Sequence, residues 1–278
     1  GGTGTCKGEG TDPVAQRCPG LETGDHRMID VNVSLGRWPF QRFLFDAARP
    51  LARHLKSCSI RKALVASTES VLYPDPDVYD EACFEQIREV PGLLPVKTVN
   101  PVLATWRTSL CDFADRYELK AIRLYPSYHR YGLDDPIVNE LVKTAIKLKL
   151  PVMVAVRVED ERQQYSLMQV PGVPLAAIAK FAAAHPRARV IALNGYFHEI
   201  VAVKERRNLY FDIAFAELTD TLRALTEYMP ARQLLFGSQT PFLTTKAAAM
   251  KVDLANISQG NCERIAEGNA VSLFRLDR

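Results

Sequence analysis

Eight short apolar runs, separated by amphipathic stretches, make up the chain from residue 28 onward. The runs cover residues 28–33, 62–67, 93–99, 120–125, 151–156, 189–193, 208–213 and 233–236. Strands that alternate with helical segments indicate a parallel sheet, and eight strands are the number that closes into a barrel. A doubly wound open sheet would normally carry a glycine-rich turn after its first strand, and Leu35-Gly-Arg-Trp-Pro39 is not one. The pattern therefore predicts an α/β fold, a single-domain (β/α)8 TIM barrel over residues 28–278.

Two of the intervening stretches carry clear helix signals. In residues 136–149, Asp135 is placed as the N-cap and Pro136 occupies the first turn. The apolar spacing predicts an inward face made of Ile137, Leu141, Ala145 and Leu148. Residues 174–184 begin with a proline in the same way, so a second helix is expected there.

Residues 1–27 differ in kind from the rest of the chain. They hold seven of the 15 glycines and no aromatic residue. Such a segment buries too little apolar surface to offset the entropy of ordering it. We expect a disordered tail over residues 1–27, with Met28 as a candidate natural start.

Composition excludes several classes of function. The 35 basic and 32 acidic residues give a formal charge of +3, and no basic tract is interleaved with aromatic residues, so no nucleic-acid partner is expected. No apolar stretch approaches the ~20 residues of a membrane span, so no membrane partner is expected either. The six cysteines form no CxxC pair, which predicts free thiols in a reducing compartment and hence a cytoplasmic location.

In an eight-stranded barrel the active site lies at the carboxyl ends of the strands. This rule selects the polar and aromatic residues at or just after each predicted strand end. They are Asn32, Ser34, Arg37, Glu69, Asn100, Arg123, Tyr125, Arg157, Glu159, Asn194, His198, Asp212 and Gln239. Simple alternation along the first strand would place Asp30, Asn32 and Ser34 on one face.

Five segments, in this order, carry a family resemblance. They are Asp30-Val-Asn-Val-Ser34, Ile122-Arg-Leu-Tyr-Pro126, Leu150-Pro-Val-Met-Val-Ala155, Phe236-Gly-Ser-Gln-Thr-Pro241 and Gly268-Asn-Ala-Val-Ser-Leu-Phe274. With them the chain resembles the amidohydrolase superfamily, in particular the amidohydrolase-related branch called amidohydrolase family 2. The resemblance extends from Met28 to Leu276, and it implies the barrel fold.

The resemblance also shows what this chain lacks. At the five positions where the family's metal ligands are expected, the chain has Asn32, Ser34, Ala155, Asn194 and Gln239. Amides and hydroxyls are weak partners for zinc or iron. We therefore expect no metal ligand and no cofactor, and the family's metal-activated water should not be carried over. The alternative is a weakly held divalent cation on Asp30, Glu159 and Asp160, because carboxylates suit magnesium, calcium or manganese.

The residues that remain favour binding of a small polar or anionic molecule. Arg37, Arg123 and Arg157 are expected to converge from three strand ends, and guanidinium groups bind carboxylate or phosphate. The other predicted substrate-binding residues are Asn32, Ser34, Asn194 and Gln239. The alternative for the arginines is salt bridging with Glu69, Glu159 and Asp30.

Four residues are candidates for proton transfer or its support. His198 is the leading candidate, since the pKa of histidine lies near neutrality. Glu159 and Asp160 could act as acid or base, in a charged run that is equally well explained as a solvated loop. Asp30 is expected to orient its neighbours.

Two functions stay open from the sequence. The first is a hydrolase or lyase acting on a small polar or anionic substrate without the usual catalytic metal, since the branch includes decarboxylases, hydrolases and lactonases. The second is a non-catalytic amidohydrolase-fold protein that binds a small molecule or a partner. The resemblance also implies a homodimer.

Overall fold

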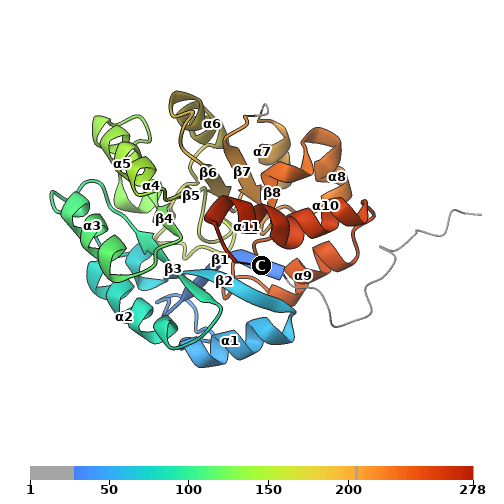
Figure 1. Cartoon of the computed structure of the whole chain (residues 1–278), viewed down its shortest axis with the longest axis horizontal. Helices are drawn as coiled ribbons and strands as arrows, with labels where there is room; N and C mark the ends of the chain where they lie inside the picture. Colours follow the sequence, from blue (N-terminus) through green and yellow to red (C-terminus); the bar gives the residue numbers. More distant parts are fainter. Residues whose placement is uncertain (1–27, 204–205, 278) are drawn as a thin grey trace, which may run out of the picture.

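The computed structural model describes residues 28–203 and 206–277, and within them eight parallel strands form one barrel (Figure 1). The strands are β1 (Met28–Leu35), β2 (Ile60–Ser67), β3 (Leu93–Thr98), β4 (Ala121–Leu124), β5 (Val152–Ala155), β6 (Val190–Leu193), β7 (Leu209–Asp212) and β8 (Leu234–Leu235). Each strand pairs with the next in sequence order. The ring closes where Val31 N donates to Phe236 O at 3.0 Å and Ser34 N donates to Thr240 O at 2.8 Å. The predicted TIM barrel is confirmed, while the predicted tail lies outside the described residues.

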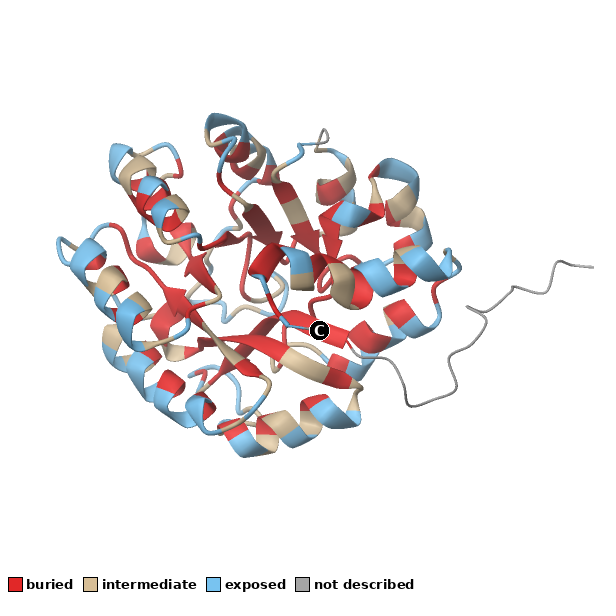
Figure 2. Cartoon of the chain, viewed as in Figure 1, coloured by how far each residue is buried: buried red, intermediate tan, exposed pale blue. Residues whose placement is uncertain are grey.

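Helices surround the barrel and bury one face each against it, so their outer faces are exposed and the strands are buried (Figure 2). The main helices are α1 (Ala48–Ser57), α2 (Asp77–Arg88), α3 (Trp106–Arg116), α5 (Pro136–Lys147), α6 (Leu175–Ala184), α7 (Phe197–Val201), α8 (Thr221–Tyr228) and α9 (Thr245–Asp253). The shorter elements are η1 (Glu69–Val71), α4 (Pro126–His129), η2 (Ala231–Gln233), α10 (Gln259–Glu263), η3 (Arg264–Gly268) and α11 (Asn269–Phe274). Within the described residues no helix has the length and apolar character needed to cross a bilayer.

The predicted face of α5 needs a correction. The helix begins at Pro136 as expected, but Val138, Leu141, Val142, Thr144 and Ala145 are its buried residues. Ile137 is 38% exposed, so the buried stripe is displaced from the predicted one. Nor does the Asp135 side chain cap α5, because it accepts a hydrogen bond from Gly132 N instead.

Apolar contacts inside the barrel are divided between its two ends. At one end, strand residues such as Ile29, Met153 and Leu235 pack against Leu273 and Phe274 of α11, which lies across the ring (Figure 1). At the other end, a second cluster joins Trp38, Val71, Tyr125, Ala155 and Val158, with Phe43, Tyr128 and Phe242 packed against it. The residues of this second cluster lie at or after strand ends, so the cluster marks the mouth of the barrel. We call it the aromatic cover.

Strand β1 does not alternate simply. Its pairing with β2 shifts register between Asp30 and Val33. Ile29 and Val31 belong to the interior cluster, whereas Val33 and Leu35 belong to the cluster between strands and outer helices. The expectation that Asp30, Asn32 and Ser34 share one face is therefore wrong, because a β-bulge redirects the side chains that follow it.

Candidate functional site

A buried polar centre lies in the barrel at the carboxyl ends of β1, β6 and β7. Asn32 Nδ2 donates to Asn194 Oδ1 and to Asp212 Oδ2, both at 2.7 Å. Asn194 N donates to Asp212 Oδ1 at 2.7 Å. All three residues are at most 2% exposed. The structure thus joins the predicted Asn32 and Asn194 through Asp212, a residue that the strand-end rule selected but to which no role had been assigned.

Backbone conformation aims two of these groups. Asn194 and Gln239 both adopt positive φ, 65° and 55°, which asparagine tolerates better than most residues. Gln239 is buried, and its Nε2 donates to Val158 O at 2.7 Å, which ties the strand β8 extension to the segment after β5. At Gly237 a Cβ atom would lie 2.8 Å from Asp212 Oδ2, so only glycine lets the chain pass this close to the centre.

Asp212 is the carboxylate of the centre. Burial raises its pKa to about 6, and the hydrogen bonds from Asn194 and Asn32 oppose this rise. The positive charge of Arg123 also lowers the pKa of Asp212, so the two side chains interact electrostatically. A carboxyl group with a pKa near neutrality can exchange a proton at physiological pH.

Asp30 lies beside this centre, on the side of β1 that faces the extension of β8. Its Oδ1 accepts hydrogen bonds from Asn32 N at 2.9 Å and Ser238 N at 3.1 Å, and its Oδ2 accepts from Ser238 Oγ. Complete burial raises the pKa of Asp30 to about 7 despite these bonds. Sequence reasoning did not select Ser238, since nothing in the motif indicates its partner.

Arg123 is buried in the barrel without an ionic partner. Arg123 is 2% exposed, and its Nε has no hydrogen-bond partner among the described residues. Its Nη2 donates to Val31 O over a long distance of 3.4 Å. Among the described residues no carboxylate oxygen lies within 4.0 Å of its guanidinium group, although that group cannot lose its charge. Its charge acts on Asp212 from a distance and it hydrogen-bonds to the Tyr125 side chain, but its Nε stays without a partner. Buried charges are normally in close ion pairs, so Arg123 keeps the capacity to bind an anion.

Arg157 is placed differently from Arg123. Its guanidinium group makes two hydrogen bonds of 2.7 Å to the Glu199 carboxylate, and it stacks on the Tyr196 ring at 3.8 Å. Another bond of 2.7 Å reaches Asn194 O. Arg157 is therefore occupied by the protein, and its contacts support Asn194 from outside the centre.

The remaining predicted residues lie at the rim or in the wall. The Arg37 side chain is 85% exposed, so the three arginines do not converge. Asp160 bonds to Arg162, which lowers the pKa of Asp160 to about 2, whereas burial raises that of half-buried Glu159. His198 is exposed and lines, with Asp160, a hollow of about 590 Å³.

Two other positions complete the set of expected ligand sites. Ser34 is 3% exposed and lies beside the β8 extension, to which its N–H donates. Ala155 belongs to the aromatic cover. Neither contributes a charged group to the centre.

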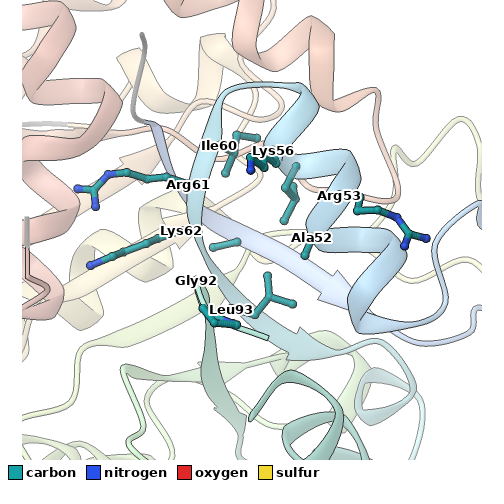
Figure 3. Close-up of a pocket in the computed structure, with 11 residues that line it drawn as sticks. Ala52, Arg53, Lys56, Ile60, Arg61, Lys62, Gly92 and Leu93 are labelled. Carbon is teal, nitrogen blue, oxygen red and sulfur yellow. The ribbon is translucent and has the colours of Figure 1, made fainter. Parts of the chain in front are cut away.

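A second hollow, of about 340 Å³, lies far from the mouth, near the amino ends of β2 and β3 (Figure 3). Four cations line it, Arg53, Lys56, Arg61 and Lys62, but Arg53 extends to one side and Arg61 and Lys62 to the other. Arg61 bonds to Glu267, and Lys62 donates to Asp277 O. Its cations are therefore not arranged around one anion.

Solved structures with the same fold include several decarboxylases. A 2,6-dihydroxybenzoate decarboxylase from Rhizobium matches with a TM-score of 0.72 and 14% identity, over 91% of this chain and 100% of the other. A 5-carboxyvanillate decarboxylase from Sphingomonas paucimobilis gives 0.73 and 12%, over 91% and 100%. A dihydroxybenzoic acid decarboxylase from Polaromonas, with bound manganese and 2-nitroresorcinol, gives 0.73 and 14%, over 91% and 98%.

Manganese in these structures corrects one expectation. We predicted no cofactor from the replaced ligands. Three of the solved structures with this fold hold manganese, so that prediction is wrong. The donor set of this chain differs from an ordinary site for that ion. Among residues 28–203 and 206–277, no three or more His, Cys, Asp or Glu side chains are grouped so that they could hold a metal. The alternative set of Asp30, Glu159 and Asp160 is therefore not such a group. At the centre itself the described donors are the amides of Asn32 and Asn194 and one carboxylate, Asp212, whose two oxygens each accept a hydrogen bond.

Sequence comparison gives the family. No curated protein matches the chain significantly. The family model described as amidohydrolase matches residues 61–276, which is most of the chain and includes β2 to β8. The buried centre lies at the strand ends where this fold places its active sites. The chain therefore belongs to the amidohydrolase family.

Proposed function

We propose that the protein is a lyase that removes carbon dioxide from a small aromatic acid, with Arg123 binding an anionic oxygen of the substrate. The observation that carries the proposal is the buried guanidinium of Arg123, which has no carboxylate partner among the described residues. A carboxylate or phenolate would supply the missing negative charge, and arginine binds planar anions through two parallel hydrogen bonds.

A second unfilled group supports a ligand in the same place. Asn32 Oδ1 is buried and has no hydrogen-bond partner among the described residues, while the amide nitrogen of the same side chain is fully used. An unpaired buried acceptor costs about 1–3 kcal/mol. A substrate hydroxyl could donate to it, so the centre offers one cation and one acceptor.

The mouth suits an aromatic substrate. Trp38, Tyr125, Tyr128 and Phe242 lie in or against the cover, and pockets for small molecules are mainly apolar with a few polar groups that fix orientation. The solved structures with this fold named above include decarboxylases whose names refer to dihydroxybenzoate and 5-carboxyvanillate. Both names describe aromatic acids, in agreement with this cover.

Asp212 is assigned the proton transfer. In decarboxylation the bond between the ring carbon and the carboxyl carbon breaks, and its electron pair stays on the ring carbon. That carbon takes the proton of the Asp212 carboxyl group, and carbon dioxide leaves. The pKa of about 6 keeps part of Asp212 protonated near neutral pH, as a general acid requires. Solvent then returns a proton to Asp212.

Substrate reaches Arg123 when the cover opens. At the cover, Gln239 Nε2 donates to Val158 O, and Phe40 contacts Trp38 edge-on and stacks on Tyr165 with ring centroids 5.6 Å apart. Tyr165 is 50% exposed and belongs to the long segment between β5 and α6. Loop movements of this kind commonly admit substrate and then exclude water.

The test uses 2,6-dihydroxybenzoate and 5-carboxyvanillate as probes, with and without added manganese. We expect both to raise the melting temperature of the wild-type protein, and at least one to release carbon dioxide. Arg123→Met should weaken binding by roughly 10- to 100-fold, as expected for a lost hydrogen bond to a charged group. Arg37→Met, at the exposed rim, is the matched control and should bind as the wild type does.

Three outcomes separate the alternatives. Binding that depends on Arg123 without turnover would support the non-catalytic binder instead of the lyase. Equal binding by Arg123→Met and the wild type would contradict the assignment of Arg123. Turnover that survives Asp212→Asn would contradict the assignment of the proton to Asp212.

A further inference from the structure

A row of buried hydroxyl groups connects Asp30 to a histidine on the outer helix α1. Ser238 Oγ lies 2.5 Å from Asp30 Oδ2 and 2.6 Å from Thr240 Oγ1. Thr240 Oγ1 lies 2.7 Å from Thr245 Oγ1, which in turn lies 2.7 Å from His54 Nε2. The four residues from Asp30 to Thr245 are at most 3% exposed, while His54 is half-buried. The row therefore runs from the barrel wall to the outer ring, where α1 and α9 are neighbours (Figure 1).

The geometry permits two proton arrangements along this row. Each hydroxyl has one hydrogen, so it donates to one neighbour and accepts from the other. When Asp30 is ionised, Ser238 donates to it, Thr240 donates to Ser238, Thr245 donates to Thr240, and His54 must carry its hydrogen on Nε2. When Asp30 is protonated, every donor reverses, and His54 Nε2 must accept.

We infer that this row is a proton relay through the barrel wall, in which the charge of Asp30 sets the tautomer of His54. A proton from solvent binds Nδ1 of His54, and the Nε2 hydrogen passes to Thr245. Each hydroxyl passes one hydrogen along, and Asp30 gains one. His54 is left neutral with its hydrogen on Nδ1, so one proton enters and one arrives, and no other group changes.

The neighbours of both ends are compatible with this exchange. The charged group that acts on Asp30 is Asp212 on β7, and the polar groups around it are Asn32 and Ser238. His54 stacks on Phe45 at 4.1 Å, and burial, with no charged neighbour contributing, lowers its pKa below 6.5. The imidazole is therefore mainly neutral where Asp30 titrates, at a pKa of about 7, so its tautomer can follow Asp30.

The relay acts on the proposed site without touching substrate. Asn32 N donates to Asp30 Oδ1, and Asn32 Nδ2 donates to Asp212 Oδ2, so one residue links the two carboxyl groups. Asp30 is thus a positioning residue behind the centre. The inference does not depend on the proposed lyase activity, because it concerns proton exchange in the folded protein alone.

Nitrogen-15 NMR of the imidazole rings tests the relay. His54→Gln identifies the signals of His54, and the ring nitrogens are followed as pH rises through 7. In the wild type we expect His54 to change from the Nδ1–H to the Nε2–H tautomer as Asp30 ionises. Thr240→Val removes one hydroxyl with little change of shape and should abolish this change, as should Asp30→Asn.

Matched variants separate a relay from general damage. Thr244→Val, at an exposed threonine beside the row, should leave the tautomer change intact. Thr240→Ser restores a hydroxyl and should restore the change. If Thr240→Val fails to fold, Thr245→Val interrupts the row at another point and should give the same loss. A His54 tautomer that stays constant in the wild type, or changes identically in Thr240→Val, Thr245→Val and the wild type, would overturn the inference.

Discussion

Two buried cations on adjacent strands differ in whether a carboxylate lies in contact with them. Lys97 on β3 lies between strands and outer helices, where its Nζ contacts Asp77 at 2.8 Å and Asp80 at 3.0 Å and lies 4.3 Å from the centre of the Phe113 ring. Arg123 on β4 points into the barrel and has no such carboxylate among the described residues. Strand pairing places these residues in neighbouring registers, Lys97 beside Ile122 and Thr98 beside Arg123.

The difference separates structure from binding. A buried charge whose partners are all present holds the fold together, and removing one partner leaves the other uncompensated. A buried charge without a partner destabilises the empty protein and is retained where a ligand supplies the counter-charge. Lys97 is therefore assigned to stability and Arg123 to binding, and the following substitutions test that division.

Lys97→Met should have the largest effect. It leaves Asp80, which is fully buried, without its cation, and breaking a buried pair costs about 3–5 kcal/mol. The free energy of unfolding, measured by urea denaturation, should fall by that amount. Lys143→Met, in an exposed pair with Glu140, is the control and should show no measurable change. A Lys97→Met protein as stable as the wild type would break the comparison.

Asp30→Asn removes a buried carboxyl group that can gain or lose a proton. Burial raises the pKa of Asp30 from 3.8 to about 7, so the folded state binds the proton more tightly than the unfolded state. This contribution is full below pH 3.8 and is lost as pH rises through about 7, by about 1.4 kcal/mol per unit of pKa difference. The stability of Asp30→Asn relative to wild type should therefore increase over that pH window. Parallel stability curves for the two proteins would show that Asp30 is ionised in the fold throughout.

Arg123→Met should leave the stability of the ligand-free protein unchanged or raise it, by on the order of 1 kcal/mol. The reason is that no carboxylate among the described residues lies within ion-pair distance of this charge, so only its longer-range attraction to Asp212 is lost. Urea denaturation beside Lys97→Met measures the contrast directly. A loss as large as that of Lys97→Met would mean that Arg123 has a structural partner.

Arg162→Ala should have the smallest effect. Its guanidinium bonds to Asp160 at the rim, but the Arg162 side chain is 86% exposed, and water and salt screen such a pair. Neither the melting temperature nor the binding of aromatic acids should change measurably. Weaker binding in Arg162→Ala would move the site from the buried centre toward the rim.

The barrel could be predicted because its signal is local. Short apolar runs of strand length recur between helical stretches, and each run matches a strand of the structure within a few residues. The inward face of α5 was missed in part because Val138 and Ile137 are equally apolar, and only packing decides between them.

The site was less predictable because its contacts are distant in sequence. Arg157 could not be recognised as paired, since its partner Glu199 is 42 residues away. The role of His54 depends on Thr245, 191 residues along the chain. The β1 bulge that turns Asp30 away from Asn32 leaves no mark in an otherwise regular Asp-Val-Asn-Val-Ser pattern. Strand-end position alone did select Asn32, Asn194 and Asp212, which the structure brings into one hydrogen-bonded cluster.

The packing of α11 across the ring has a consequence for biosynthesis. Leu273 and Phe274 complete the apolar layer beneath the polar centre, against residues as early in the chain as Ile29. A nascent chain that has already made all eight strands still exposes this layer to water until α11 leaves the ribosome. Shortened translation products ending before Asn269 would therefore expose apolar surface at this end of the barrel, of the kind that chaperones and proteases recognise.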